Sequence, residues 1–329
     1  MNRSVLILLV KLAVSGGLLF WVLGSIDRAR LFDAVLDLDP VLLCASFAVL
    51  VMQYPLGALR WRELLRLIGL DMDTREVIRI HLVGVFLNQM LPSALGGDAY
   101  RVWSAGRGGR GWGRAVCSVL LDRVAALMVL VLLLAAMLPH LATILPDGPV
   151  TESLVMLVLV AIVVMPVGFA LARPVGRLLD RMRFLRKLAP IAMNANLLWS
   201  EGGASLRIAV FGLMTQLSTA ACVWLIALAA GADIGFFTML GLTLPVLLTL
   251  AVPISIAGWG VREGAMIFAL GLVGIPAESG LLISLVWGAL SLTGGVISGV
   301  AFLLQAPERE KLATYAAEAG ALGERDAEH

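Results

Sequence analysis

The chain has 329 residues, of which 60% are hydrophobic and only 15% are charged, and its mean hydropathy is +0.95. Soluble domains carry about a quarter charged residues, so the composition excludes an ordinary soluble enzyme and indicates a helical protein that crosses a membrane several times. The formal net charge is +2, and the three cysteines and three histidines are widely spaced. We therefore expect neither a disulfide framework nor a metal site, and no other cofactor.

The apolar stretches predict about six full membrane spans, since one span needs about 20 apolar residues. They are 5–24, 41–59, 115–138, 152–172, 206–230 and 280–304. No small-residue cleavage site is evident after the first stretch, so we interpret it as a retained span. We expect a single membrane domain over residues 1–305, followed by a polar cytoplasmic tail at 306–329.

The segment 77–100 begins like a membrane helix and is then interrupted. The interruption joins helix-breaking and flexible residues to an acid and a base: Asn88, Pro92, Ser93, Gly96, Gly97, Asp98 and Arg101. Unpaired backbone N–H and C=O groups are costly in hydrocarbon. Such a break is therefore expected only inside protein or beside a water-filled cavity.

The segment 236–275 holds a second interruption of the same kind. It contains Pro253, Gly258, Trp259, Arg262 and Glu263. Both interruptions run from proline to arginine in nine positions, with a glycine at the fifth. Two interrupted segments at matching places in two halves of a chain are typical of transporter binding sites.

The distribution of basic residues predicts how these segments sit in the membrane. Lys and Arg are concentrated in 60–79, 101–114 and 173–187, whereas 139–151 and 231–236 contain none. Basic loops lie on the cytoplasmic side. This rule is satisfied throughout only if 77–100 enters from the cytoplasm and returns, and if 236–275 does the same from outside. Both termini are then cytoplasmic, and we expect a multi-pass protein of the cytoplasmic (inner) membrane.

This topology predicts an inverted repeat built from residues 41–138 and 206–304. Each half would contain a span, a broken re-entrant hairpin and a second span. The alternative is that the proline-to-arginine spacing arises by chance and that both segments are ordinary kinked helices. The segment 188–203 is either an amphipathic helix in the cytoplasmic interface or a connecting loop.

Ionisable residues at membrane depth are rare and usually face a cavity or a partner. We identify six: Asp98, Arg101, Asp122, Arg123, Arg262 and Glu263. A returning half-helix has a positive N-terminus, so Arg101 and Arg262 beside the breaks, with Arg123, are candidate contacts for a phosphate or another anion. Asp98 either caps the returning helix or acts in the site.

Two further pairs each have alternative interpretations. Asp122 and Arg123 either belong to the site or form a structural ion pair near the interface. Glu263 is either the counter-ion of Arg262 or a carboxylate that couples proton movement. The loop 107–114 is rich in Arg and Gly like some nucleic-acid-binding segments, but contact with anionic lipid explains it more simply, and no nucleic-acid partner is expected.

Several of these motifs resemble one known family. The run from Asn88 to Arg101 is similar to the signature of the flippase-like membrane domain of lysylphosphatidylglycerol synthases, as are Leu121-Asp122-Arg123 and the run from Gly258 to Gly264. The resemblance covers nearly the whole chain and matches the length of the small stand-alone members. It implies translocation of a charged lipid between leaflets.

The resemblance has limits that affect the expected chemistry. Bifunctional synthases carry more membrane spans and a soluble aminoacyl-transferase domain, neither of which is expected here, so lysyl transfer is not implied. Relatives of this domain are also fused to glycosyltransferases, so a polyprenyl-linked or glycosylated lipid is an alternative substrate. The chain shows no Walker lysine, HExxH or GxSxG motif, and we do not expect an enzyme.

The leading hypothesis is that the protein moves an anionic or phosphate-bearing lipid across the cytoplasmic membrane. The candidate substrate-binding residues are Asn88, Pro92, Ser93, Gly96, Gly97, Asp98, Arg101, Asp122, Arg123, Pro253, Gly258, Trp259, Arg262 and Glu263. The first alternative is a membrane-embedded transferase acting on a lipid phosphate or polyprenyl-linked glycolipid, with Asp98 or Glu263 as base. The second is a non-transporting partner of a cell-envelope assembly or lipid-modifying enzyme.

Overall fold

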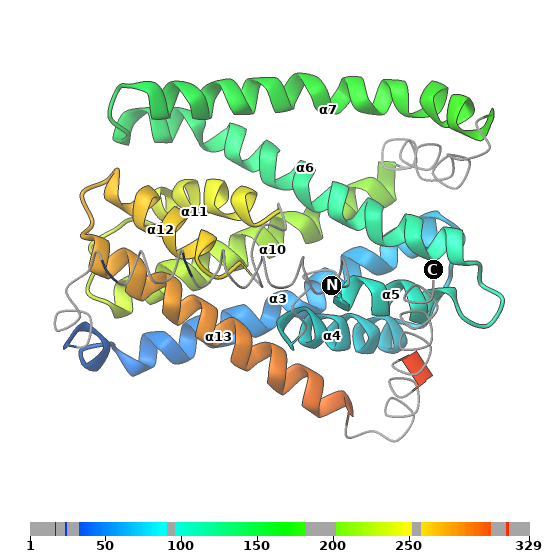
Figure 1. The fold of residues 1–329 in the computed structure, drawn as a ribbon, viewed down its shortest axis with the longest axis horizontal. Coiled ribbons are helices and arrows are strands. Elements are labelled where there is room, and N and C mark those ends of the chain that lie inside the picture. The colour runs from blue at the N-terminus through cyan, green and yellow to red at the C-terminus, as the bar shows by residue number, and fades with distance from the viewer. Residues whose placement is uncertain are drawn as a thin grey trace.

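The structure is a computed structural model that describes residues 33–90, 96–181, 202–251 and 258–303, together with Gly17, Gly24 and residues 314–315. Throughout these residues the regular structure is helical, without β-strands, which confirms the all-α class. The helices are α3 (Pro40–Leu67), α4 (Thr74–Met90), α5 (Gly96–Gly106), α6 (Trp112–Ile144), α7 (Pro149–Arg181), α10 (Gly202–Ala229), α11 (Phe236–Ala251), α12 (Val261–Gly271) and α13 (Ala277–Leu303) (Figure 1).

Four described helices are long and apolar enough to cross a membrane, namely α3, α6, α10 and the part of α13 from Ala277 to Val300. They correspond to the predicted spans 41–59, 115–138, 206–230 and 280–304. The predicted span 152–172 lies in α7, where Pro149–Met165 forms a shorter apolar stretch. The predicted span 5–24 lies outside the described residues, apart from Gly17 and Gly24. The presence of several helices long and apolar enough to span a membrane is therefore confirmed, and the full number of spans stays a prediction.

Helix α3 is longer than the sequence indicated. Asp39 starts it by accepting hydrogen bonds from the backbone N–H groups of Val41 (2.7 Å) and Leu42 (3.2 Å). It ends only before Gly69, which has a φ of +73°. The expected end at residue 59 is therefore wrong, because nothing between 60 and 67 breaks the helix. As a consequence, Arg60 lies on a membrane helix rather than in a loop.

Both predicted interruptions separate a pair of short helices. Helices α4 and α5 have 17 and 11 residues, and α11 and α12 have 16 and 11. The connections at 91–95 and 252–257, which include Pro92, Ser93 and Pro253, lie outside the described residues. The order long, short, short, long thus occurs in α3–α6 and again in α10–α13.

The contacts between helices follow the same twofold pattern. Helix α3 packs on α4 as α10 packs on α11, and α5 packs on α6 as α12 packs on α13. Helix α13 packs on α4, and its counterpart α6 packs on α11, while α3 and α10 form the most extensive contact of all. Apart from α6 with α7, every substantial contact in the described chain has a counterpart when the two groups of four helices are exchanged.

The two ends of the helix bundle differ in their described charges: one carries arginines as well as acids, and the other carries acids without arginine. At one end, Arg110 after α5 pairs with Glu76 on α4 (3.3 Å), so both ends of this hairpin lie together. Arg114 also reaches the carbonyl of Gly69 there (3.3 Å). At the other end, where α3 begins and α6 and α10 finish, the described chain has no arginine but carries acids: Asp33, Asp37, Asp39, Asp147, Glu152, Asp233 and Glu278.

This difference in charge generates a prediction of membrane orientation. In a variant whose exposed Cys44 is replaced by serine, Asp71→Cys and Gly113→Cys should both resist a membrane-impermeant thiol reagent in intact cells. Asp147→Cys and Asp233→Cys should react, because the arginine-free end is expected to face outward. Labelling after permeabilisation controls for accessibility. Reaction of only one of positions 71 and 113 would mean that α4 and α5 cross the membrane instead of returning.

Candidate functional site

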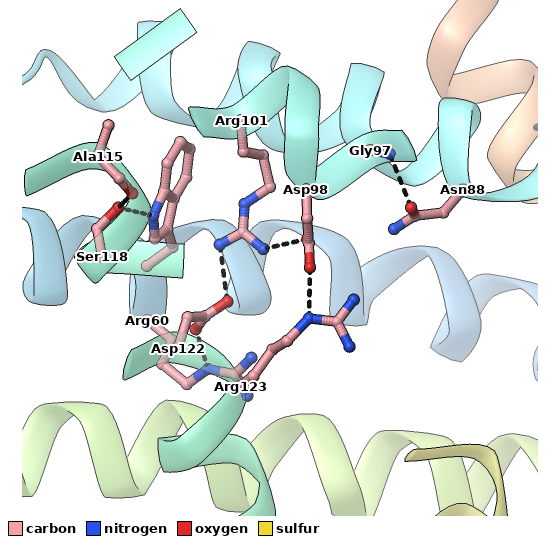
Figure 2. A network of polar contacts seen from close by, with 10 residues as sticks. Arg60, Asn88, Gly97, Asp98, Arg101, Ala115, Ser118, Asp122 and Arg123 are labelled. Carbon is pink, nitrogen blue, oxygen red and sulfur yellow. Dashed lines mark hydrogen bonds and ion pairs between the residues drawn. The ribbon is translucent and has the colours of Figure 1, made fainter. Parts of the chain in front are cut away.

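Five charged side chains form a continuous network between α3, α5 and α6 (Figure 2). Nε of Arg60 donates to Oδ1 of Asp122 (2.8 Å), and Nη2 of Arg101 donates to Oδ2 of the same carboxylate (2.7 Å). Nη1 of Arg101 also donates to Oδ1 of Asp98 (3.2 Å). Nε of Arg123 donates to the other oxygen of Asp98. Asp98, Arg101, Asp122 and Arg123 were predicted site residues, and the fold brings these four together.

The network is buried at its centre and opens at one end. The exposed fraction of the side chain is 3% for Asp122 and 7% for Arg101, but 44% for Arg123. Three arginines face two aspartates, which leaves a formal charge of +1 on the five residues. The excess positive charge therefore has its most accessible point at Arg123.

The network lies along an interior stretch of a long apolar helix. Asp122 is ten residues after Trp112, the first residue of α6, which corresponds to a rise of about 15 Å along the helix axis. Trp112 is 54% exposed, as is common for an aromatic side chain at a membrane surface. Charged side chains within an apolar span are costly unless they are paired, and the two aspartates supply these pairs.

The indole ring of Trp61 packs against the guanidinium of Arg101, the central arginine of the network. Cζ of Arg101 lies 4.3 Å from the ring centroid of Trp61, which is fully buried. Nε1 of Trp61 donates to Oγ of Ser118 (3.1 Å), which donates to the carbonyl of Ala115 (2.7 Å). Arg60 and Trp61 were not predicted as site residues, because the predicted helix ended at residue 59. The spacing of Trp61, Leu64 and Leu65, which is typical of one apolar face of a helix, was the available signal.

Gly97, the glycine at the fifth position of the first interruption, permits a close approach of two helices. A Cβ atom there would collide with the carbonyl oxygen of Gly84 on α4 and lie 2.7 Å from its carbon. Oδ1 of Asn88 accepts a hydrogen bond from the N–H of Gly97 (2.8 Å). Asp98 lies inside the first turn of α5, which begins at Gly96, so the expected alternative that Asp98 is the N-cap of this helix is wrong. Asn88 instead satisfies a backbone N–H of this first turn. Gly96 is buried beside this contact.

The second interruption uses glycine differently. Gly258 and Gly260 have φ values of +83° and +87°, which side chains other than glycine rarely adopt. Oε2 of Glu263 accepts a hydrogen bond from the N–H of Gly260 (2.5 Å), and Oε1 of Glu263 accepts one from Nη2 of Arg262 (2.7 Å). Ser284 on α13 donates to the same Oε1 (3.2 Å). Glu263 is therefore both the counter-ion of Arg262 and a cap for α12.

Arg262 is enclosed as well as paired. Its Cζ lies 4.7 Å from the ring centroid of Trp259 and 5.5 Å from that of Trp287. A Cβ atom at Gly288 would lie 2.8 Å from Cζ, so this glycine makes room for the guanidinium. Arg262 is only 5% exposed. The sequence did not predict Ser284, Trp287 or Gly288, because nothing in it says which face of α13 meets α12.

Helix α13 contacts residues that lie beside both interruptions. Gly288 faces the guanidinium of Arg262, and a Cβ atom at Gly295 would lie 2.8 Å from Cγ of Gln89, near the end of α4. Seven residues of helix rise about 10 Å. The broken ends of both hairpins therefore approach one short stretch of α13.

The close crossing at Gly97 leads to a prediction. Gly97→Ala should force α5 away from α4 and lower the melting temperature of the purified protein, with a cost of about 1–3 kcal/mol typical of overpacking. Gly113→Ala is the matched control. It lies on a helix with open space around it, so alanine should be neutral or slightly stabilising. Equal melting temperatures for the two variants would contradict the close contact.

The shared aspartate leads to a second prediction. Asp122→Asn leaves Arg60 and Arg101 without their common counter-ion, and breaking such a buried pair typically costs about 3–5 kcal/mol. Glu76→Gln removes the partner of Arg110 in a pair whose side chains are 32% and 37% exposed, and should cost about 0–1 kcal/mol. Thermal unfolding of both variants in one detergent measures the difference. A loss at Asp122 no larger than that at Glu76 would show that the network does not hold the helices together.

The comparisons with known proteins agree with the motifs. The family model of the lysylphosphatidylglycerol synthase TM region matches residues 8–299, a range that contains both interruptions and the whole ion network. Comparison with curated proteins and with solved structures found no match. The chain therefore belongs to the lysylphosphatidylglycerol synthase transmembrane-region family, and this membership implies a membrane function related to lipids.

Proposed function

We propose that the protein translocates an anionic, phosphate-bearing lipid between the leaflets of the cytoplasmic membrane. The observation that carries this proposal is the buried network with one more arginine than aspartate, about 15 Å along α6 from Trp112 and accessible at Arg123. The five described residues together carry a formal charge of +1, and positive charge is costly in hydrocarbon, so an anionic ligand would stabilise it. The family's relation to membrane lipids makes a lipid head group the natural source of that anion.

The arrangement of the helices supports an inverted-repeat transporter. In such proteins the substrate site lies near the bilayer midplane at the interface of two repeats, and discontinuous helices form it. The matching contacts of α3–α6 and α10–α13 and the approach of both interruptions to α13 support this geometry. Hairpin α4–α5 would enter from the cytoplasmic side and α11–α12 from outside.

The arginines would have unequal roles in binding the head group. Arg123 is half-exposed and pairs with Asp98, so an entering phosphate would compete with that carboxylate for its guanidinium. Arg101 is held by Asp98 and Asp122, while its Nε is buried without a hydrogen-bond partner. The guanidinium of Arg262 is already hydrogen-bonded to Glu263 and Ser284, so it would contact a ligand only after those hydrogen bonds break.

An apolar groove offers a route for the acyl chains. It has a volume of about 280 Å³ and runs between α6, α7, α11 and α12. Leu141, Leu154, Pro245 and Phe268 are among its lining residues. In this proposal the acyl chains would stay in hydrocarbon or in this groove while the arginines contact the head group.

The test is lipid movement in proteoliposomes that contain a fluorescent anionic phospholipid and an external quencher. Arg123→Gln should slow movement about 10–100-fold, since a hydrogen bond to a charged group contributes about 1.5–3 kcal/mol. Lysine at this position should restore part of the rate, because it lacks the planar fork. Arg207→Gln is the matched control, since Arg207 is similarly exposed (56%) and also paired, with Glu63 (2.7 Å).

Two results would count against translocation. Equal rates for Arg123→Gln and Arg207→Gln would remove the assigned anion contact. A protein-dependent change in the mass of the lipid would instead support the membrane-embedded transferase. The lipid is therefore recovered after each assay and its mass is measured by mass spectrometry.

A further inference from the structure

A second polar site lies at the arginine-rich end of the bundle, away from the ion network. It is a pocket of about 320 Å³ beside the end of α5. Helices α4 and α5 and the loop before α6 supply its principal residues, which are Glu76, Ile80, Trp103, Ser104, Arg107 and Arg110. None of these residues takes part in the network of Figure 2.

The pocket contains a buried hydroxyl group without a hydrogen-bond partner. Ser104 is only 8% exposed, and its Oγ has no partner in the described structure. A buried polar group left unpaired costs about 1–3 kcal/mol. Because Ser104 lines the pocket, a ligand oxygen placed there would satisfy the hydroxyl.

The charges around this hydroxyl favour an anion. Arg110 is partly neutralised by Glu76 at 3.3 Å. Arg107 has no acidic partner among the described residues, and its Cζ lies 4.3 Å from the ring centroid of Trp103. The two arginines and one glutamate leave a formal charge of +1, beside a free hydroxyl donor.

The wall that carries Arg107 is rigid. The ring of Trp103 stacks on that of Tyr100, with centroids 5.8 Å apart. Tyr315, from the C-terminal segment, packs edge-on against both rings, at 5.6 Å from Tyr100 and 5.3 Å from Trp103. A guanidinium held against a fixed ring loses little side-chain entropy when it binds a ligand.

The position of the pocket matches the level of lipid phosphates. The first residue of α6, Trp112, is exposed, and its ring packs against Gly106 at the end of α5. Exposed tryptophans mark the membrane–water interface. The pocket therefore opens at the surface that is predicted to be cytoplasmic, where the phosphates of anionic lipids are concentrated.

We infer that Ser104, Arg107 and Arg110 form a surface site for a phosphate group, supplied by an anionic lipid head group or by free phosphate. The guanidinium groups would contact its charged oxygens, and the hydroxyl of Ser104 would donate to one of them. This site does not depend on lipid translocation, since a chain that moves no lipid would still bind at it.

The test uses the full-length protein in detergent and measures binding by calorimetry and by the rise in melting temperature. The probes are dihexanoyl phosphatidic acid, inorganic phosphate and, as a zwitterionic control, dihexanoyl phosphatidylcholine, all at one ionic strength. Arg107→Gln should weaken binding of the anionic probe at least 10-fold, and Ser104→Ala about 3- to 10-fold, as expected for a lost hydrogen bond. Arg177→Gln, an exposed arginine on α7, should leave binding unchanged.

The two sources of phosphate give different results. Binding of phosphatidic acid alone would identify a lipid site, and binding of inorganic phosphate as well would identify a site for the free anion. Equal affinity in the parent protein, Arg107→Gln and Ser104→Ala would overturn the inference. Ser104→Ala removes only an unpaired hydroxyl, so it should remain folded even if Arg107→Gln does not. Loss of binding with normal lipid movement, or the reverse, separates this site from the translocation path.

Discussion

The carboxylate of Asp122 is the contact on which the rest of this structure depends. Each of its oxygens accepts a hydrogen bond from a different arginine, one on α3 and one on α5. The aspartate itself is on α6, so one side chain joins the long helices α3 and α6 to the short helix α5. In hydrocarbon neither arginine would be tolerated alone. The ion network therefore couples the broken hairpin to the long helices around it, and Asp98 extends that coupling to Arg123 at the accessible end.

The helices that flank the two interruptions are positioned by different physical means. In the first, the absence of a side chain at Gly97 lets α5 lie directly against the backbone of α4 at Gly84. In the second, Gly258 and Gly260 adopt positive φ angles, and Glu263 satisfies the backbone N–H exposed by the turn. Helices α5 and α12 each also carry an arginine over a tryptophan, Arg101 over Trp61 and Arg262 over Trp259. The first arginine belongs to a network that reaches an exposed residue, and the second is enclosed by its partners.

Much of the organisation could be predicted because it depends on local patterns. Runs of apolar residues indicated the four described spans, and Pro and Gly indicated where α4 and α11 end. The rarity of charge in these runs directed attention to Asp98, Arg101, Asp122 and Arg123, which the structure brings into contact. The predicted end of α3 was wrong, because no helix-breaking residue occurs between residues 60 and 67 and the helix continues. Arg60 and Trp61 were assigned to a loop, although only Gly69 ends α3.

The sequence by itself determined that the chain is helical, that it crosses a membrane, and that two of its segments are broken beside charged residues. These properties follow from hydropathy, backbone hydrogen bonding and the cost of charge in lipid, all of which act within a short stretch of chain. Only the tertiary structure decided which side chains meet: Asp122 with Arg60, Ser284 with Glu263, Gly288 with Arg262, and Tyr315 with Trp103. Those pairings depend on the rotation and crossing of helices far apart in the chain. No local property of either partner specifies that arrangement.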